Sequence, residues 1–105
     1  MAESEKRGVA ESSMGDIDNL RQRIDAIDRQ IVQLLNERAG CALEIGRHKE
    51  AVGQPVYQPA REAEVLASVR AVNRGPLDDA AMTRLFERII DEARRLERLA
   101  TEEKE

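Results

Sequence analysis

The chain has 105 residues, of which 41% are hydrophobic and 36% are charged. These proportions fit one small globular domain rather than a disordered chain or a membrane protein. The formal net charge of -4 argues against a nucleic-acid-binding protein, whose phosphate contacts need a basic surface. Cys41 is the only cysteine, so no disulfide can form within the chain, and the polar start contains no apolar signal segment. We therefore expect a cytoplasmic protein that binds neither nucleic acid nor membranes.

The first predicted element is a long helix. Residues 1–15 have no hydrophobic period and carry charges of both signs, so we expect a disordered leader there. From Ile17 onward, apolar residues recur at the two core positions of a heptad, which predicts one helix running to about Val52. Asp16 is its expected N-cap and Gly53 its expected end. The residues of this apolar stripe are Ile17, Leu20, Ile24, Ile27, Ile31, Leu34, Cys41 and Ile45.

Two shorter helices are predicted to follow. The prolines of "GQPVYQP" indicate a loop, and Pro59 suits the first turn of a second helix, where its missing N–H costs nothing. This helix ends at "NRGP", and its expected inward residues are Leu66, Val69 and Val72. Asp78 is the expected N-cap of a third helix, which leads to an acidic tail at 101–105. The sequence thus predicts an all-α domain over residues 16–100, built from one long and two shorter helices.

The length of the first helix implies a partner. A helix from Ile17 to Val52 is roughly 54 Å long at 1.5 Å per residue, whereas a compact monomer of this size is only ~33 Å across. Two shorter helices cannot cover an apolar stripe of that length, and a second copy of the chain packed along it can. We therefore expect an obligate homodimer with paired long helices. An ordinary coiled coil is the competing interpretation.

Two cations interrupt the apolar stripe. Arg38 occupies a core position of the heptad, and Lys49, eleven residues later, lies only about 20° around the helix from it. Taken singly, Arg38 could set the register of a coiled coil and Lys49 could extend to water. Other charged residues also lie on or beside the inner faces of their helices: Arg61, Glu62 and Glu97.

These three residues have ordinary explanations too, since Arg61 and Glu62 could form a weak surface pair and Glu97 could be a solvated acid. A buried charge without a partner, however, costs free energy. Charged residues on the inner faces of all three helices are better explained together, by a polar pocket that holds an anion.

Four motifs support this interpretation through a family resemblance. "LRxxIDxID", "LLxxR", "IGxxK" and "PxREAEVL" occur in that order, and "RLFERIIDEARRLE" follows them. Their order and spacing resemble the all-helical class of chorismate mutase, especially the mutase domain at the front of bifunctional chorismate mutase–prephenate dehydratases. The resemblance covers about residues 16–99. It implies the chorismate mutase type II fold, an intertwined homodimer of three-helix chains with two shared active sites.

The resemblance also implies a reaction and the residues that serve it. The reaction is the pericyclic rearrangement of chorismate to prephenate, on the way to phenylalanine and tyrosine. Arg38 and Lys49 of one chain and Arg21 of the other would bind the two carboxylates of the substrate. Arg61 would support this cationic wall, and Glu62 would accept a hydrogen bond from the ring hydroxyl. Glu97 would donate to the ether oxygen together with Lys49. Two further site positions differ from relatives, with Gln58 in place of Asp and Ala93 in place of Ser.

A unimolecular rearrangement needs no nucleophile, metal or redox cofactor, and we expect none here. Glu97 can donate to the ether oxygen only as the neutral acid, so we expect catalysis to weaken as the pH rises through its ionisation. Isochorismate–pyruvate lyase shares this fold and a cationic pocket, although Glu62 within "REAEVL" favours a mutase. A non-catalytic helical dimerisation or regulatory module is the alternative outside enzymes.

Overall fold

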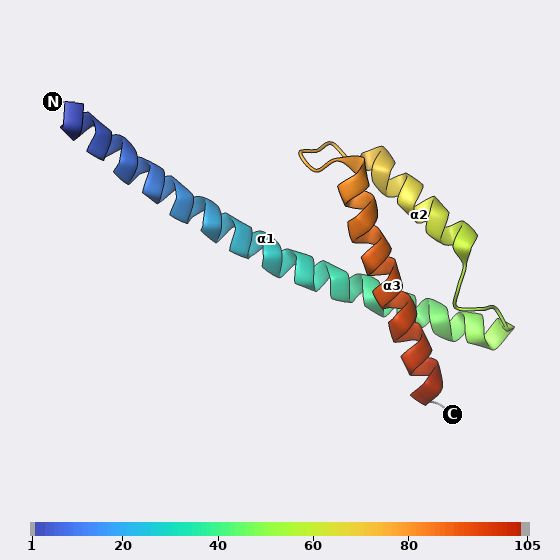
Figure 1. Ribbon diagram of the computed structural model, residues 1–105. Helices are drawn as coiled ribbons and strands as arrows, with labels where there is room; N and C mark the ends of the chain where they lie inside the picture. The colour runs from blue at the N-terminus through green and yellow to red at the C-terminus, as the bar shows by residue number, and fades with distance from the viewer. Residues whose placement is uncertain (1, 104–105) are drawn as a thin grey trace. The chain divides into compact units, whose positions relative to one another are not determined.

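The computed structural model describes residues 2–103, and the side chains described are those of residues 10–102. It contains three helices, α1 (Ala2–Val52), α2 (Pro59–Val72) and α3 (Asp79–Glu103), as Figure 1 shows. Residues 2–103 include no strand, so the predicted all-α fold of one long and two shorter helices is confirmed. None of these helices is both long enough and apolar enough to cross a membrane. The chain divides into two units, Met1–Leu35 and Asn36–Glu105.

The first unit is the N-terminal part of α1. The helix begins at Ala2, so the predicted start after an Asp16 cap is wrong, because the backbone before Asp16 is already helical. This stretch contains Ala, Glu, Lys, Arg and Met, which favour helix, and no proline, so the helix continues through the potential cap. The division into leader, domain and tail stays a prediction. The apolar stripe of this unit is 46% to 61% exposed in the single chain, at Ile17, Leu20, Ile24, Ile27, Ile31 and Leu34.

In the second unit, the end of α1 and the start of α2 follow the predicted signals. Gly53 has a φ of 74°, in the left-handed region that glycine adopts without a steric cost. The N–H of Gly53 donates to the carbonyl of Glu50 (3.2 Å), and that of Gln54 to the carbonyl of Lys49 (2.8 Å), which together form a Schellman motif. Pro59 occupies the first turn of α2. Backbone chemistry therefore fixes both ends of the loop formed by residues 53–58.

The turn between α2 and α3 is held by side chains. The Asp78 carboxylate accepts a hydrogen bond from the N–H of Ala81 at 2.7 Å, which confirms the predicted cap of α3. Asn73, directly after α2, donates from its side chain to the carbonyl of Leu77 (2.9 Å) and to the carboxylate of Asp79 (2.9 Å). This network joins the end of α2 to the start of α3, and the two helices pack against each other.

Little hydrophobic surface is buried within one chain. Ile90 on α3, 7% exposed, is the only buried hydrophobic side chain among residues 10–102. Leu66 and Val69 on α2 are partly buried, as predicted. Val72 is 73% exposed, so its predicted inward position is wrong, because it is the last residue of α2 and lies where the chain leaves the helix. A 105-residue domain normally buries far more apolar surface than this.

Candidate active site

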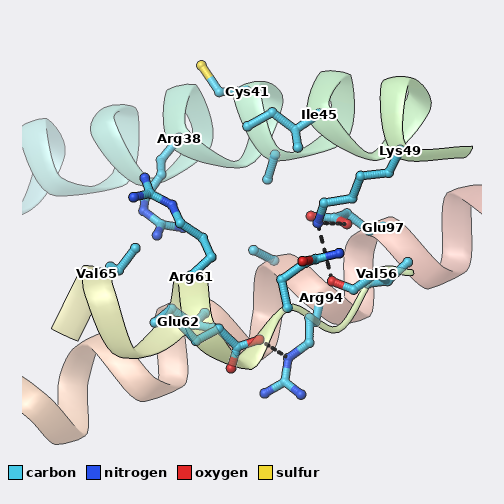
Figure 2. Close-up of a pocket in the computed structure, with 14 residues that line it drawn as sticks. Arg38, Cys41, Ile45, Lys49, Val56, Arg61, Glu62, Val65, Arg94 and Glu97 are labelled. Atoms are coloured by element: carbon cyan, nitrogen blue, oxygen red, sulfur yellow. Dashed lines mark hydrogen bonds and ion pairs between the residues drawn. The ribbon is translucent and has the colours of Figure 1, made fainter. Parts of the chain in front are cut away.

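A cavity of about 330 Å³ opens in the second unit, and residues from all three helices and the 53–58 loop line it (Figure 2). Its volume is within the range of small-molecule sites. Among the residues that line it are seven of the eight predicted site residues: Arg38, Lys49, Gln58, Arg61, Glu62, Ala93 and Glu97. The eighth, Arg21, lies in the first unit and is exposed.

The α1 side of the cavity follows the helical spacing of the sequence. Arg38 and Lys49 both line the cavity, which confirms that these two cations share a face. Ala42 and Ile45 lie between them along the helix and provide an apolar surface. Figure 2 shows Arg38 reaching from α1 toward the side of the cavity where Arg61 reaches from α2. The break in the heptad at Arg38 therefore marks the position where α1 borders a cavity.

Lys49 is held between α3 and the 53–58 loop. Its ammonium nitrogen lies 3.5 Å from Oε2 of Glu97 and donates to the carbonyl of Val56 at 3.2 Å. Both side chains of the pair are largely buried, at 16% exposure for Lys49 and 8% for Glu97. Oε2 of Glu97 is itself buried and has no hydrogen bond to the described residues. An acid and a cation are thus fixed side by side in the wall of the cavity.

Gly46 allows this close approach of α1 and α3. A Cβ atom at position 46 would lie 3.2 Å from Cγ of Glu97 and 3.5 Å from its Oε2. Contacts at 3.2 Å are tighter than ordinary van der Waals contact, so any larger residue would displace the Glu97 side chain. The glycine of the "IGxxK" motif therefore has a local packing reason, which the sequence alone did not indicate.

The two charged residues that open α2 have different partners. Arg61 pairs with Glu64 at 2.7 Å on the surface, and its side chain is 67% exposed. Glu62 is more buried, and its Oε2 lies 3.3 Å from Nε of Arg94 on α3. The surface pair between Arg61 and Glu62, considered as an alternative from the sequence, does not form. Glu62 is instead tied across the cavity edge to another helix.

Arg94 is the residue of this site that sequence reasoning missed. Its guanidinium carbon lies 5.0 Å from the centre of the Tyr57 ring, a cation–π distance. A spacing signal was present, because Arg94 follows the buried Ile90 by four residues and precedes Glu97 by three, which places all three on one helix face. The inner face of α3 is therefore more highly charged than the prediction assumed.

The arrangement defines a class of protein. Four cations line the cavity, Arg38, Lys49, Arg61 and Arg94, against the two acids Glu62 and Glu97. Residues 10–102, whose side chains the structure describes, include no group of three or more His, Cys, Asp or Glu side chains placed to hold a metal ion. A local excess of cations in a chain of net charge -4 favours a small anionic ligand. The fold and the site thus define a class of all-α proteins with a small-molecule cavity in which cations outnumber acids.

Comparison with known proteins identifies the family. The family model for chorismate mutase type II matches residues 20–98, and the chain belongs to this family. A bifunctional chorismate mutase/prephenate dehydratase from Stutzerimonas stutzeri is 43% identical over 83 residues, which cover 74% of this chain and 23% of that protein. The chain thus spans about a quarter of the length of such curated relatives. This agrees with the resemblance inferred from the motifs.

Two solved structures extend the comparison to the fold. A chorismate mutase (form II) from Thermus thermophilus is 40% identical, with a TM-score of 0.77 over 78% of this chain and 93% of that chain. A chorismate mutase from Helicobacter pylori, in complex with prephenate, is 30% identical, with a TM-score of 0.77 over 83% of this chain and 94% of that chain. The three-helix chain of the type II fold, as predicted from the motifs, is therefore confirmed.

Proposed function

We propose that this chain catalyses the rearrangement of chorismate to prephenate, and so serves the biosynthesis of phenylalanine and tyrosine. One observation carries the proposal: a single cavity gathers Arg38, Lys49, Glu62 and Glu97, the charged residues expected from the motifs of the family. The family membership and the prephenate held by the Helicobacter pylori relative support the same assignment. The reaction needs no nucleophile, so the charged residues of the cavity must accelerate it in another way.

The chemistry is unimolecular. The ether C–O bond of chorismate breaks while a new C–C bond forms and two double bonds shift, so three pairs of electrons move within the same molecule. A protein can therefore help in two ways, by holding the flexible dianion in its compact reactive conformer and by stabilising the negative charge that grows on the ether oxygen. Fixed cations and hydrogen-bond donors in a pocket from which substrate displaces water do both.

Arg38 and Lys49 are assigned to the carboxylates of the substrate, since both line the cavity from α1. The planar guanidinium of Arg38 suits a carboxylate because it can donate two parallel hydrogen bonds. Lys49 also donates to the ether oxygen, with Glu97 beside it at 3.5 Å as the second donor. Arg61 adds positive charge to this wall from α2.

The remaining assignments concern orientation. Glu62 accepts a hydrogen bond from the ring hydroxyl, and Gln58 borders the same part of the site from the 53–58 loop. The Gln58 side chain donates to the carbonyl of Pro55 at 2.9 Å, so its substrate contact is assigned to the main chain, where the change from Asp matters little. Ala93 offers no hydrogen bond where relatives carry Ser, and no charged anchor is lost by that difference.

The same proposal includes an intertwined homodimer in which Arg21 of the partner chain completes each site. The support is the exposed apolar stripe of α1 and the single buried hydrophobic residue among residues 10–102. Apolar surface of this extent needs a cover, and a second copy supplies a matching stripe. A biosynthetic enzyme of this kind acts on a small molecule in the cytoplasm, with no part for nucleic acid or a membrane surface.

The decisive experiment is product identification. Purified protein is incubated separately with chorismate and with isochorismate, and the products are separated and identified. Prephenate from chorismate supports the proposal, pyruvate from isochorismate would assign the lyase, and no turnover of either would favour a non-catalytic module.

Lys49 provides the matched test of the site. Lys49→Ala is expected to lower kcat by about 10²–10³-fold, because it removes a preorganised donor to the ether oxygen. Arg88→Ala is the control, since the Arg88 side chain is 75% exposed, pairs with Glu92 on the same helix and does not line the cavity. Equal turnover by both variants, with the oligomeric state unchanged, would remove Lys49 from the mechanism.

A further inference from the structure

Arg94 lines the cavity, yet the proposed chemistry gives it no role. Its side chain is 27% exposed and contacts two other segments of the second unit. On α2, Oε2 of Glu62 lies 3.3 Å from its Nε, and in the 53–58 loop the Tyr57 ring lies 5.0 Å from its guanidinium carbon. On its own helix it pairs with Asp91. One guanidinium therefore joins α3, the start of α2 and the loop between α1 and α2.

Arg94 is oriented toward Glu62 rather than toward the proposed substrate. Figure 2 shows its guanidinium directed away from Lys49 and Arg38, with the Glu62 carboxylate turned to meet it. Its Nε is buried and close to Glu62, although the geometry of this contact is that of an ion pair and not of an aligned hydrogen bond. This orientation fits a residue that acts through Glu62.

Glu62 needs such a restraint because of its neighbours. It is an anion in a cavity whose other charged wall residues include the cations Arg38 and Arg61. Opposite charges attract each other across such a cavity, so an unrestrained Glu62 would turn inward and pair with these cations, with Arg38 in particular, because Arg61 already pairs with Glu64. The carboxylates of an anionic substrate would then have to displace it, which weakens binding without changing the chemical step.

We propose that Arg94 is a positioning residue that holds Glu62 at the edge of the cavity and so keeps the substrate-binding cations free. This inference rests on the proposed function, since it takes chorismate as the ligand and Glu62 as the acceptor of its ring hydroxyl. The stack on Tyr57 extends the same restraint to the loop whose Val56 carbonyl accepts from Lys49 at 3.2 Å. Arg94 thereby connects the two sides of the site.

The test compares Arg94→Gln with a matched control on the same helix. Arg95 is the next residue along α3, and its side chain is 67% exposed. Its Nη1 lies 3.9 Å from Oε2 of Glu92, so Arg95→Gln removes a guanidinium that does not reach the cavity. In steady-state kinetics with chorismate, Arg94→Gln is expected to raise KM about tenfold, because it removes one charge-assisted contact. Its kcat is expected to change by less than about threefold. Arg95→Gln is expected to match the wild type in both constants.

The Glu62→Gln background shows whether Arg94 acts through Glu62. Without a carboxylate at position 62 there is nothing to restrain, so adding Arg94→Gln is expected to change KM by less than about twofold, a strong departure from additivity. An undiminished tenfold effect in this background would overturn the proposal, because Arg94 would then contact the substrate itself. Arg94→Lys keeps the charge next to Glu62 and is expected to recover most of the wild-type KM.

Thermal unfolding and circular dichroism accompany each variant. A lower melting temperature in Arg94→Gln with an unchanged KM would reduce Arg94 to a structural role and overturn the inference. If Arg94→Gln does not fold, Tyr57→Leu weakens the same restraint and is expected to raise KM, and a wild-type KM in that variant would count against the inference. If the wild-type protein does not turn over chorismate, the proposed function itself is overturned. If the wild type is active and Arg94→Gln has the same KM and kcat, only the inference about Arg94 is overturned.

Discussion

Glu97 is tested by a variant that keeps a hydrogen-bond donor and one that has none. Its Oε2 lies 3.5 Å from Nζ of Lys49 in the wall of the cavity. Glu97→Gln keeps the length of the side chain and carries an N–H, so its kcat is expected to stay within about tenfold of the wild type, whereas Glu97→Leu, which has no donor, is expected to lower kcat by about 10²-fold. A wild-type kcat in Glu97→Leu would show that Glu97 is not the donor.

Replacing Gly46 by alanine is expected to lower activity while leaving stability nearly unchanged. Gly46→Ala places a methyl group 3.2 Å from Cγ of Glu97, and a displacement of a few tenths of an ångström is expected to lower kcat by roughly three- to tenfold. Replacing glycine in a helix also gains about 1 kcal/mol of helix propensity, which offsets the crowding. Activity should therefore fall while the free energy of unfolding changes little, as measured by urea titration.

Gly40 on the same helix provides the control for Gly46. A Cβ atom there meets nothing within 4 Å, so Gly40→Ala is expected to be as active as the wild type and slightly more stable. A similar loss of activity in both variants would attribute the effect to the helix rather than to Glu97.

Helical spacing in the sequence was enough to predict site residues that share one face of a helix. It could not predict residues whose role depends on a contact with another helix. Arg38 and Lys49 could be placed on one face by counting along α1, and both line the cavity. Gly46 and Arg94 have ordinary positions in their own helices. Their significance comes from Glu97 and Glu62 on neighbouring helices, and no periodicity within one helix reports such a contact.

At the scale of the element, the N-cap of α3 makes a measurable prediction. Asp78 accepts a hydrogen bond from the N–H of Ala81 at 2.7 Å, and removing it in Asp78→Ala is expected to cost about 1 kcal/mol of stability. Asp78 does not line the cavity, so kcat should stay within about twofold of the wild type, since the lost cap acts on stability alone. Asp78→Asn is the control, because asparagine caps as well as aspartate. An unchanged urea midpoint in Asp78→Ala would mean that the cap adds nothing to stability.

Boundaries marked by backbone chemistry were predictable, and the start of α1 was not. Gly53, Pro59 and Asp78 each change what the backbone can do at one position, and the structure has a helix boundary at or beside each of them. Asp16 could act as an N-cap only if the helix began there. The residues before it favour helix, so the same side chain lies within a continuous α1.

The whole molecule raises the question of what covers α1. The stripe from Ile17 to Leu34 is exposed in one chain, and Arg21 lies within that stretch of α1. The proposed homodimer would account for both facts, because a partner would cover the stripe and Arg21 would complete the partner's site. The proposal of a second copy follows from length and periodicity alone, since the two shorter helices are too short to cover an apolar stripe of this length.

The shared site predicts complementation between two inactive variants. Arg21→Ala and Lys49→Ala each damage both sites of their own homodimer. In a mixed dimer of the proposed kind, one site would receive both substitutions and the other neither, because Arg21 and Lys49 of one site would come from different chains. Co-expression at equal levels makes half of the dimers mixed, so about a quarter of wild-type activity should return. If each chain instead builds its own site, the mixture will be no more active than the average of the two variants, and Arg21 must then act elsewhere.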